Sequence, residues 1–395
     1  MKVVIFFAIT LISSNVLSSP LQLVRSISHE RPAFTKILEE DDVSNLYISS
    51  FKFMGGDNVK KYVDLENHLN SRSINIETIV DKIIWPNEIE KYPGLINGEE
   101  QFVVSSGFFP PTKNTGAVHL FGKASKSLLK VTKDKKGWWY HRTRFWDYDR
   151  DGVMDILTAR AYKGMVWGKG AEFLVLLAPN EGSRTRWEEK VLFEGPDVFF
   201  ELVDLDSDGE FEVISSQFLN EKISYHYKNH TNRKWEEKII DNTIGPGFDL
   251  SYVDLNADGK KEILLTNHVS TKKAGVFVYE SPKDPRNEDW HRHVIHEGFV
   301  TTARGIGQAS PGNAKAFNPM GEQVDGKLSI VVSGDGNEKV HLFTPTEEPW
   351  KYKHEVIYNG KGIIGKVTAA DSDKDGKAEI YIPAYDENKI LIFEY

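Results

Sequence analysis

The sequence predicts an all-β protein that forms one seven-bladed β-propeller, with six blades as the alternative. An acidic loop with the pattern D-x-[DN]-x-D-G-x-x-[DE] starts at residues 147, 204, 254 and 371. A short apolar run typical of a β-strand follows each copy. Units of about four short strands that recur at a fixed spacing indicate a propeller, because no blade can bury its faces alone.

The spacing of the loops gives the blade count. Successive copies lie 57, 50 and 117 residues apart, so the last gap holds two units. Degenerate copies that keep only the glycine lie at residues 324–330 and 96–102. Residues 31–82 lack the loop but contain strand-like runs, and we interpret them as a first blade. The last unit is too short for four strands, so we expect a segment near residues 34–38 to close the ring.

The four loops are predicted calcium sites between the first two strands of their blades. Carboxylates at positions one, three, five and nine bring oxygen ligands to one point, and a hard cation such as Ca²⁺ prefers oxygen. An EF-hand would need a glutamate at position twelve and flanking helices, and both are missing here. The metal is expected to stabilise the fold. The expected ligands are Asp147, Asp149, Asp151, Asp155, Asp204, Asp206, Asp208, Glu212, Asp254, Asn256, Asp258, Glu262, Asp371, Asp373, Asp375 and Glu379.

Three further features bear on where the protein acts. Residues 1–18 have the layout of a cleavable signal peptide, which predicts a secreted, extracellular protein. Residues 19–32 are then expected to be an N-terminal extension, and residues 33–395 the propeller domain. The apolar run within residues 1–18 is too short to span a membrane. There is no cysteine, so bound calcium and ring closure would replace disulfides. Asn229 is in the only glycosylation sequon.

The charge pattern excludes one class of partner. The net charge is −9, and no basic tract interrupts the acidic composition. A nucleic acid is therefore not an expected partner.

Polar residues are expected to gather on the face opposite the calcium loops. That face carries the connections between the second and third strands of each blade and the connections from one blade to the next. His, Arg and Tyr side chains that converge there could perform acid–base chemistry on a sugar. The hypothetical catalytic residues are His141, Arg160, His268 and Arg304, and the candidate ligand-binding residues are Gln217, Asn267, Gln308, Asp335 and Tyr385. The spacing of His291 and His293 would also suit a transition metal, but a solvated strand face is the simpler interpretation.

The acidic loops resemble the FG-GAP/VCBS repeats of integrin-type propellers, and four units match. The runs Trp85-Pro86-Asn87-Glu88, Gly107-Phe108-Phe109, residues 157–161 and Leu265-Thr266-Asn267-His268 also resemble the propeller part of aldos-2-ulose dehydratase-like proteins, over most of residues 80–395. This second resemblance implies a sugar dehydratase or lyase ancestry. The cupin-type isomerase part of that enzyme has no counterpart, so isomerase activity is not expected.

Two functions stay open at this point. The first is a secreted, calcium-stabilised propeller that binds a protein or glycan partner through its loop-rich face. The second is a carbohydrate lyase or dehydratase that acts on a ketosugar or related polyol at the channel mouth. A deep pocket that contains His141, Arg160, His268 and Arg304 together would favour the enzyme, and a shallow or aromatic face would favour the binding module.

Overall fold

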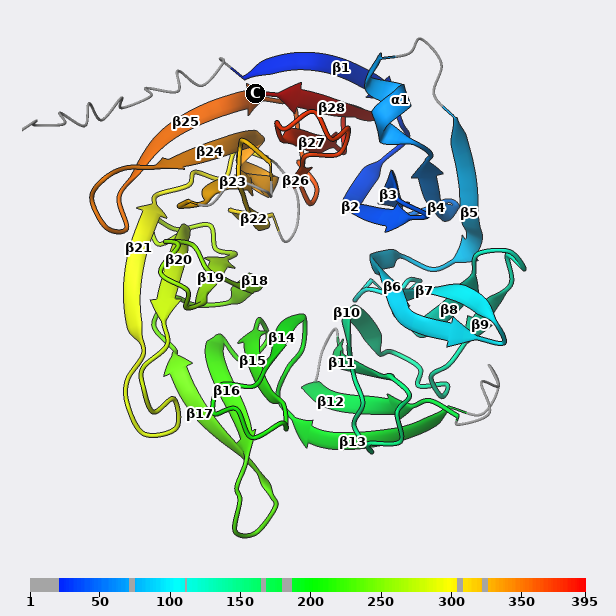
Figure 1. The fold of residues 1–395 in the computed structure, drawn as a ribbon, viewed down its shortest axis with the longest axis vertical. Helices are drawn as coiled ribbons and strands as arrows, with labels where there is room; N and C mark the ends of the chain where they lie inside the picture. Colours follow the sequence, from blue (N-terminus) through cyan, green and yellow to red (C-terminus); the bar gives the residue numbers. More distant parts are fainter. Residues whose placement is uncertain are drawn as a thin grey trace, which may run out of the picture.

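Seven four-stranded antiparallel sheets surround a central axis in the computed structural model (Figure 1). The structure describes residues 21–70, 75–110, 112–164, 168–179, 187–303, 308–321 and 326–395. The prediction of a seven-bladed propeller is confirmed, and the six-bladed alternative is wrong. No helix within these ranges has the length and apolar character needed to cross a membrane.

The first four blades follow the chain from their inner to their outer strand. They are β2 (Pro32–Glu40), β3 (Val43–Ser50), β4 (Asp57–Tyr62) and β5 (Ile76–Ile83); β6 (Pro86–Ile96), β7 (Glu99–Ser106), β8 (Val118–Gly122) and β9 (Leu128–Lys130); β10 (Trp139–Trp146), β11 (Asp155–Lys163), β12 (Lys169–Leu177) and β13 (Glu188–Glu194); and β14 (Phe199–Val203), β15 (Glu212–Gln217), β16 (Lys222–Lys228) and β17 (Trp235–Asp241).

The remaining blades continue the ring. They are β18 (Gly247–Val253), β19 (Glu262–Asn267), β20 (Gly275–Glu280) and β21 (His291–Glu297); β22 (Ala314–Phe317), β23 (Ser329–Ser333), β24 (Lys339–Pro345) and β25 (Tyr352–Asn359); and β26 (Thr368–Ala370), β27 (Glu379–Ala384), β28 (Lys389–Glu394) and β1 (Gln22–Ser28). A short helix α1 (Leu65–Asn70) follows β4, and the 3-10 turn η1 (Asp335–Asn337) follows β23.

The closing strand is β1, so the expectation that residues 34–38 close the ring was wrong. β1 pairs antiparallel with β28, with Gln22 opposite Glu394 and Ser28 opposite Lys389. Residues 34–38 belong to β2, the inner strand of the first blade. The open hydrogen-bonding edge of the last blade is its outer one, and only a segment that precedes β2 can reach it. Part of the expected N-terminal extension is therefore a strand of the propeller.

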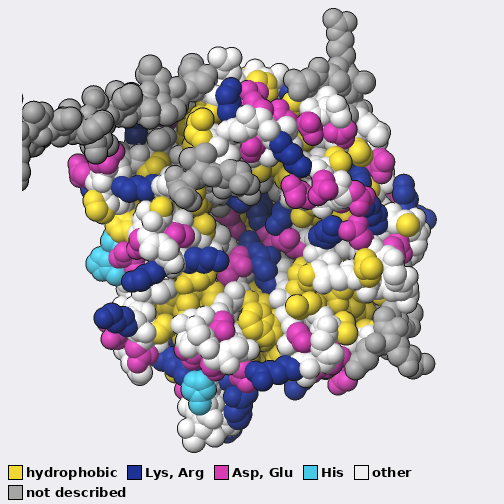
Figure 2. Space-filling model, viewed as in Figure 1, with side chains coloured by type: hydrophobic (Ala, Val, Ile, Leu, Met, Phe, Trp, Pro, Cys, Tyr) yellow, Lys and Arg dark blue, Asp and Glu magenta, His cyan; other side chains and the backbone are white. Residues whose placement is uncertain are grey.

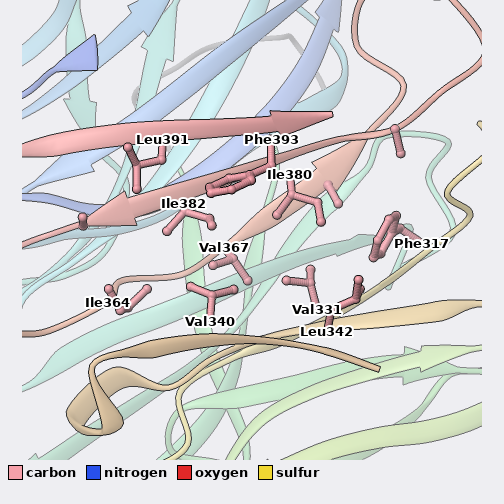
Figure 3. Close-up of a cluster of buried hydrophobic side chains, with 13 residues drawn as sticks. Phe317, Val331, Val340, Leu342, Ile364, Val367, Ile380, Ile382, Leu391 and Phe393 are labelled. Carbon is pink, nitrogen blue, oxygen red and sulfur yellow. The ribbon is translucent and has the colours of Figure 1, made fainter. Parts of the chain in front are cut away.

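Apolar side chains from neighbouring blades form the core. Between the sixth and seventh blades, Val331 and Val340 pack against Ile380 and Ile382, and all four are fully buried (Figure 3). Similar clusters lie at other blade junctions. Because each blade buries a face against both neighbours, the fold is stable only as a ring.

Candidate metal centres and loop-rich face

The four acidic loops connect the first two strands of the third, fourth, fifth and seventh blades, as predicted. They share one backbone geometry. The fourth position has a positive φ of 58° to 63° and the glycine at position six a φ of 77° to 91°, which glycine tolerates without strain. The amide of the second position donates to the carboxylate at position nine, as from Tyr148 to Asp155 (2.9 Å) and from Leu205 to Glu212 (2.9 Å).

Three of the loops bring their carboxylates together. One oxygen from each residue lies within 4.8 Å of the others in the sets Asp147, Asp149 and Asp155; Asp204, Asp206, Asp208 and Glu212; and Asp371, Asp373, Asp375 and Glu379. Asp151 is outside the first set and accepts the amide of Val153 instead (2.8 Å). The described carboxylates of the fifth-blade loop, Asp254, Asp258 and Glu262, are not gathered in this way, and Asn256 donates its side-chain amide to Asp258 (3.2 Å).

The position-nine carboxylates lie in an environment that disfavours negative charge. Burial, together with the loop aspartates, raises the pKa of Asp155 to about 6, those of Glu212 and Glu262 to about 7, and that of Glu379 to about 8. A bound cation would remove this penalty, because it neutralises the repulsion between the carboxylates.

The loop of the seventh blade also contains buried oxygen atoms that a metal ion could bind. Glu379 is fully buried, and neither its Oε1 nor the Oδ1 of Asp371 has a hydrogen-bond partner among the residues that the structure describes. A buried acceptor without a partner is unfavourable, and a metal ion would satisfy both atoms. The oxygen-only ligand set therefore fits a hard divalent cation.

On the opposite face, three of the hypothetical catalytic residues make separate sets of contacts. His141 is buried between the rings of Phe108 and Phe199, and burial lowers its pKa to about 4. Arg160 is only 4% exposed and forms ion pairs with Glu172 and Glu189. These contacts hold Arg160 inside its blade, and none of them is shared with His141. Arg304 lies outside the described residues.

His268 is the one catalytic candidate with a partner suited to acid–base chemistry. Its Nε2 lies 2.8 Å from a carboxylate oxygen of Asp335, which was predicted as a ligand-binding residue. The imidazole stacks on Phe248, with the ring centres 4.8 Å apart. A carboxylate can hold an imidazole in a fixed orientation through such a contact.

Two of the candidate ligand-binding residues have structural roles. Asn267 is fully buried and bonds to the backbone of Ile244, Lys273 and Gly275. Gln217 is likewise fully buried, and it donates to Glu237 (2.8 Å). Their side chains are used by the fold, so their prediction as ligand-binding residues is not supported.

The other two candidates remain accessible. Tyr385 is partly exposed, and its hydroxyl donates to the carbonyl of Phe51 (2.8 Å). Gln308 is also partly exposed.

An arc of aromatic rings runs around the loop-rich face. The centres of successive rings are 4.1 to 6.0 Å apart through Phe51, Trp85, Phe108, His141, Phe199, Phe248 and His268. These residues come from connections and strand ends of the first five blades. Beside this aromatic arc, Phe53 is 66% exposed and Phe109 is 41% exposed. Apolar side chains are thus exposed on this face beside the first two blades, together with charged pairs such as Arg31 with Asp386.

The central channel contains a buried network of charged side chains around Arg142. Arg142 is 3% exposed and forms ion pairs with Glu88 (2.9 Å), Glu201 (2.9 Å) and Asp249 (3.2 Å). Its other donors reach the carbonyl oxygens of Phe200 and Leu250. Burial alone would raise the pKa of Glu88, but Arg142, Lys366 and Arg144 outweigh it and hold that pKa well below its usual range.

These residues line a cavity of about 530 Å³ that extends along the inner strands toward Asp371. Figure 2 shows Lys, Arg, Asp and Glu side chains in the hollow at the centre of the molecule. All five N–H donors of Arg142 have an acceptor. The network therefore joins four blades, and this arginine has no donor left for a ligand.

Comparisons with known proteins support the fold alone. No protein-family model and no curated protein matches the sequence. Among solved structures, a glucose dehydrogenase is 11% identical over 81% of this chain and 99% of its own, with a TM-score of 0.46. The NanB sialidase of Streptococcus pneumoniae is 9% identical over 95% of this chain and 70% of its own, with a TM-score of 0.40. Both scores are too low for a functional argument.

A fungal alcohol oxidase of the AA5 family, solved in complex with copper, has a higher TM-score. It is 12% identical over 94% of this chain and 76% of its own, with a TM-score of 0.54. At that identity the likeness concerns the propeller architecture, and the function has to be argued from this chain's own residues.

Proposed function

We propose that this protein is a secreted, calcium-stabilised propeller that binds an extracellular protein or glycan partner through its loop-rich face. The observation that carries the proposal is the apolar surface beside the aromatic arc. Phe53, Met54, Ile84 and Phe109 are 66%, 87%, 40% and 41% exposed, and they come from adjacent connections of the first two blades. Exposed apolar side chains that cluster on one face mark a binding surface.

The three connections that carry these side chains are held together at Asp57. Lys113 donates to a carboxylate oxygen of Asp57 (2.6 Å), and Asp57 also accepts the backbone amides of Lys52 and Trp85. Asp57 is 1% exposed in its side chain. These hydrogen bonds order the connections that bear the exposed side chains. Less conformational entropy is therefore lost when a partner binds.

The calcium part of the proposal rests on the loop geometry and on the resemblance to FG-GAP/VCBS repeats. The residues that would hold the ions are the carboxylates gathered in the third, fourth and seventh blades. The fifth-blade loop would need the Asn256 side chain to turn its oxygen inward.

Binding can be tested with an array of glycans and extracellular matrix proteins, probed with the purified protein in Ca²⁺. We expect the double variant Phe53→Ser, Phe109→Ser to lose the bound partner. The matched control is Leu95→Ser, because Leu95 is 63% exposed at the turn between β6 and β7 on the other face. Equal binding by the double variant and the control would contradict the proposed surface.

The alternative, a carbohydrate lyase or dehydratase, is favoured by the pair of His268 and Asp335. An imidazole held by a carboxylate could remove a proton next to a sugar carbonyl. Turnover of ketosugars or uronates that His268→Gln abolishes would support this alternative. No turnover of these substrates would leave the binding function as the better account.

A further inference from the structure

Three metal-ligating side chains meet on the outer strands of the fifth blade, where Glu280 is paired with Glu262 of that blade's acidic loop across β19 and β20. One ligand atom each from Glu280, His291 and His293 lies within 4.8 Å of the other two. In the pairing of β20 with β21, Glu280 is opposite His291 and Val278 is opposite His293. Side chains two residues apart on a strand share a face, so the register places all three on the same side.

The neighbouring blade fixes one of the two imidazoles. His293 stacks on Trp350, from the connection between β24 and β25, with ring centres 4.8 Å apart and planes 23° apart. Its Nε2 lies 2.7 Å from a carboxylate oxygen of Glu280. The centre of the His291 ring is 4.5 Å from that of His293. His291 is exposed and can adjust its position.

This donor set differs from that of the acidic loops. Two imidazole nitrogens and one carboxylate suit Zn²⁺ and related ions, whereas Ca²⁺ prefers oxygen alone. Bonds of about 2.0 to 2.2 Å around a tetrahedral ion place its ligands roughly 3.4 Å apart. Small side-chain rotations would bring the three atoms to that spacing.

The geometry points to a surface site for one divalent transition-metal ion of the Zn²⁺ class, held by His291, His293 and Glu280. The side chains of His293 and Glu280 are 19% and 40% exposed, so a fourth coordination position faces solvent. In Figure 2, histidine side chains reach the outer edge of the molecule near β21, beside acidic ones. Trp350 would orient His293 in the manner of an outer contact around a metal site.

The test uses the full-length protein, stripped of metal and then kept in excess Ca²⁺ so that oxygen-ligand sites are filled. Zn²⁺ binding is measured by calorimetry near pH 7.5, and Co²⁺ absorption reports on the geometry. We expect one Zn²⁺ site per chain with this set of ligands. His291→Ala and Glu280→Gln should each weaken it by about tenfold or more.

The matched control is His296→Gln, because His296 lies on the same strand but contacts Phe299 and His354 instead. This control should keep the zinc affinity. His291 is exposed, so its variant should fold, and a thermal melt in Ca²⁺ confirms this. No zinc binding by the wild type would overturn the proposal. So would an affinity that the two variants leave unchanged, which would place the ion elsewhere, for example at His230 with Asp206 and Asp208.

Discussion

At the scale of single residues, Arg142 contributes most to holding the inner strands together. It lies on β10 and pairs with carboxylates from β6, β14 and β18. Each of those carboxylates is buried or nearly so. The loss of the guanidinium would leave several negative charges in the channel without compensation, and such charges are strongly destabilising.

We therefore predict that Arg142→Met lowers the free energy of unfolding by about 3 to 5 kcal/mol. The measurement is chemical denaturation in Ca²⁺. The control is Arg233→Met, because Arg233 is 53% exposed in its side chain and pairs only with Glu210 among the described residues. That change should leave the free energy of unfolding nearly unchanged, because an exposed ion pair adds little to stability. Similar losses in the two variants would show that the Arg142 network is not the stabilising element described here.

His141 gives a prediction about pH. Its pKa is lowered from 6.5 to about 4 by burial, so the unfolded state binds its proton first. Stability from this group is present above pH 6.5 and is lost as the pH falls toward 4. Between pH 6.5 and pH 4, the free energy of unfolding of the wild type should fall by on the order of 3 kcal/mol more than that of His141→Leu. Urea unfolding at several pH values measures it, and parallel curves for the two proteins would contradict it.

The roles of individual polar residues could be predicted least well. His268 and Asp335 were both singled out, but their pairing depends on how the fifth and sixth blades meet. Arg160 looked available because it follows an apolar run, yet the register of β11 with β12 sets Glu172 opposite it. Such partners are fixed by tertiary contacts, which one sequence does not display.

At the scale of elements, the acidic loops were predictable because their ligands lie within nine residues of one another. Their positions between the first two strands of each blade followed from the same local pattern. The closing strand was not predictable in this way. β1 pairs with a strand more than 360 residues away in sequence, and its own residues alternate too weakly to reveal the partner.

Removal of β1 should open the ring. We predict that deletion of residues 1–28 gives a protein that melts at a much lower temperature or does not fold. The deletion removes the outer partner of β28, and it removes Ile27 from a core with Leu46, Tyr62 and Ile392. The control is the deletion of residues 1–20, which keeps β1. A cooperative melt at the same temperature for both truncated proteins would contradict the closure.

The seventh-blade loop should show its metal dependence in a single variant. We predict that Asp371→Asn lowers the melting temperature in Ca²⁺ but not in EDTA, because a lost ligand matters only when the ion is bound. Asp289→Asn is the control, since its carboxylate is fully exposed. An equal loss of stability in both buffers would mean that Asp371 acts through its hydrogen bonds alone.

At the scale of the whole molecule, the fold class and the blade count followed from the repeat spacing. The number of blades is a property of the entire chain, and even the blade without an acidic loop, β2 to β5, kept the strand pattern that predicted it. The function was less accessible, because the aromatic arc is assembled from five blades and the contacts of Arg142 from four. Neither has a local signature.

The central claim is that calcium stabilises this propeller, and the most direct measurement is its thermal unfolding in EDTA and in millimolar Ca²⁺. Metal bound only by the folded state stabilises it by mass action, so several sites together should raise the melting temperature by roughly 10 °C or more. Mg²⁺ should restore little of this, because it demands a smaller octahedral site. Identical melting curves in EDTA and in Ca²⁺ would contradict the account.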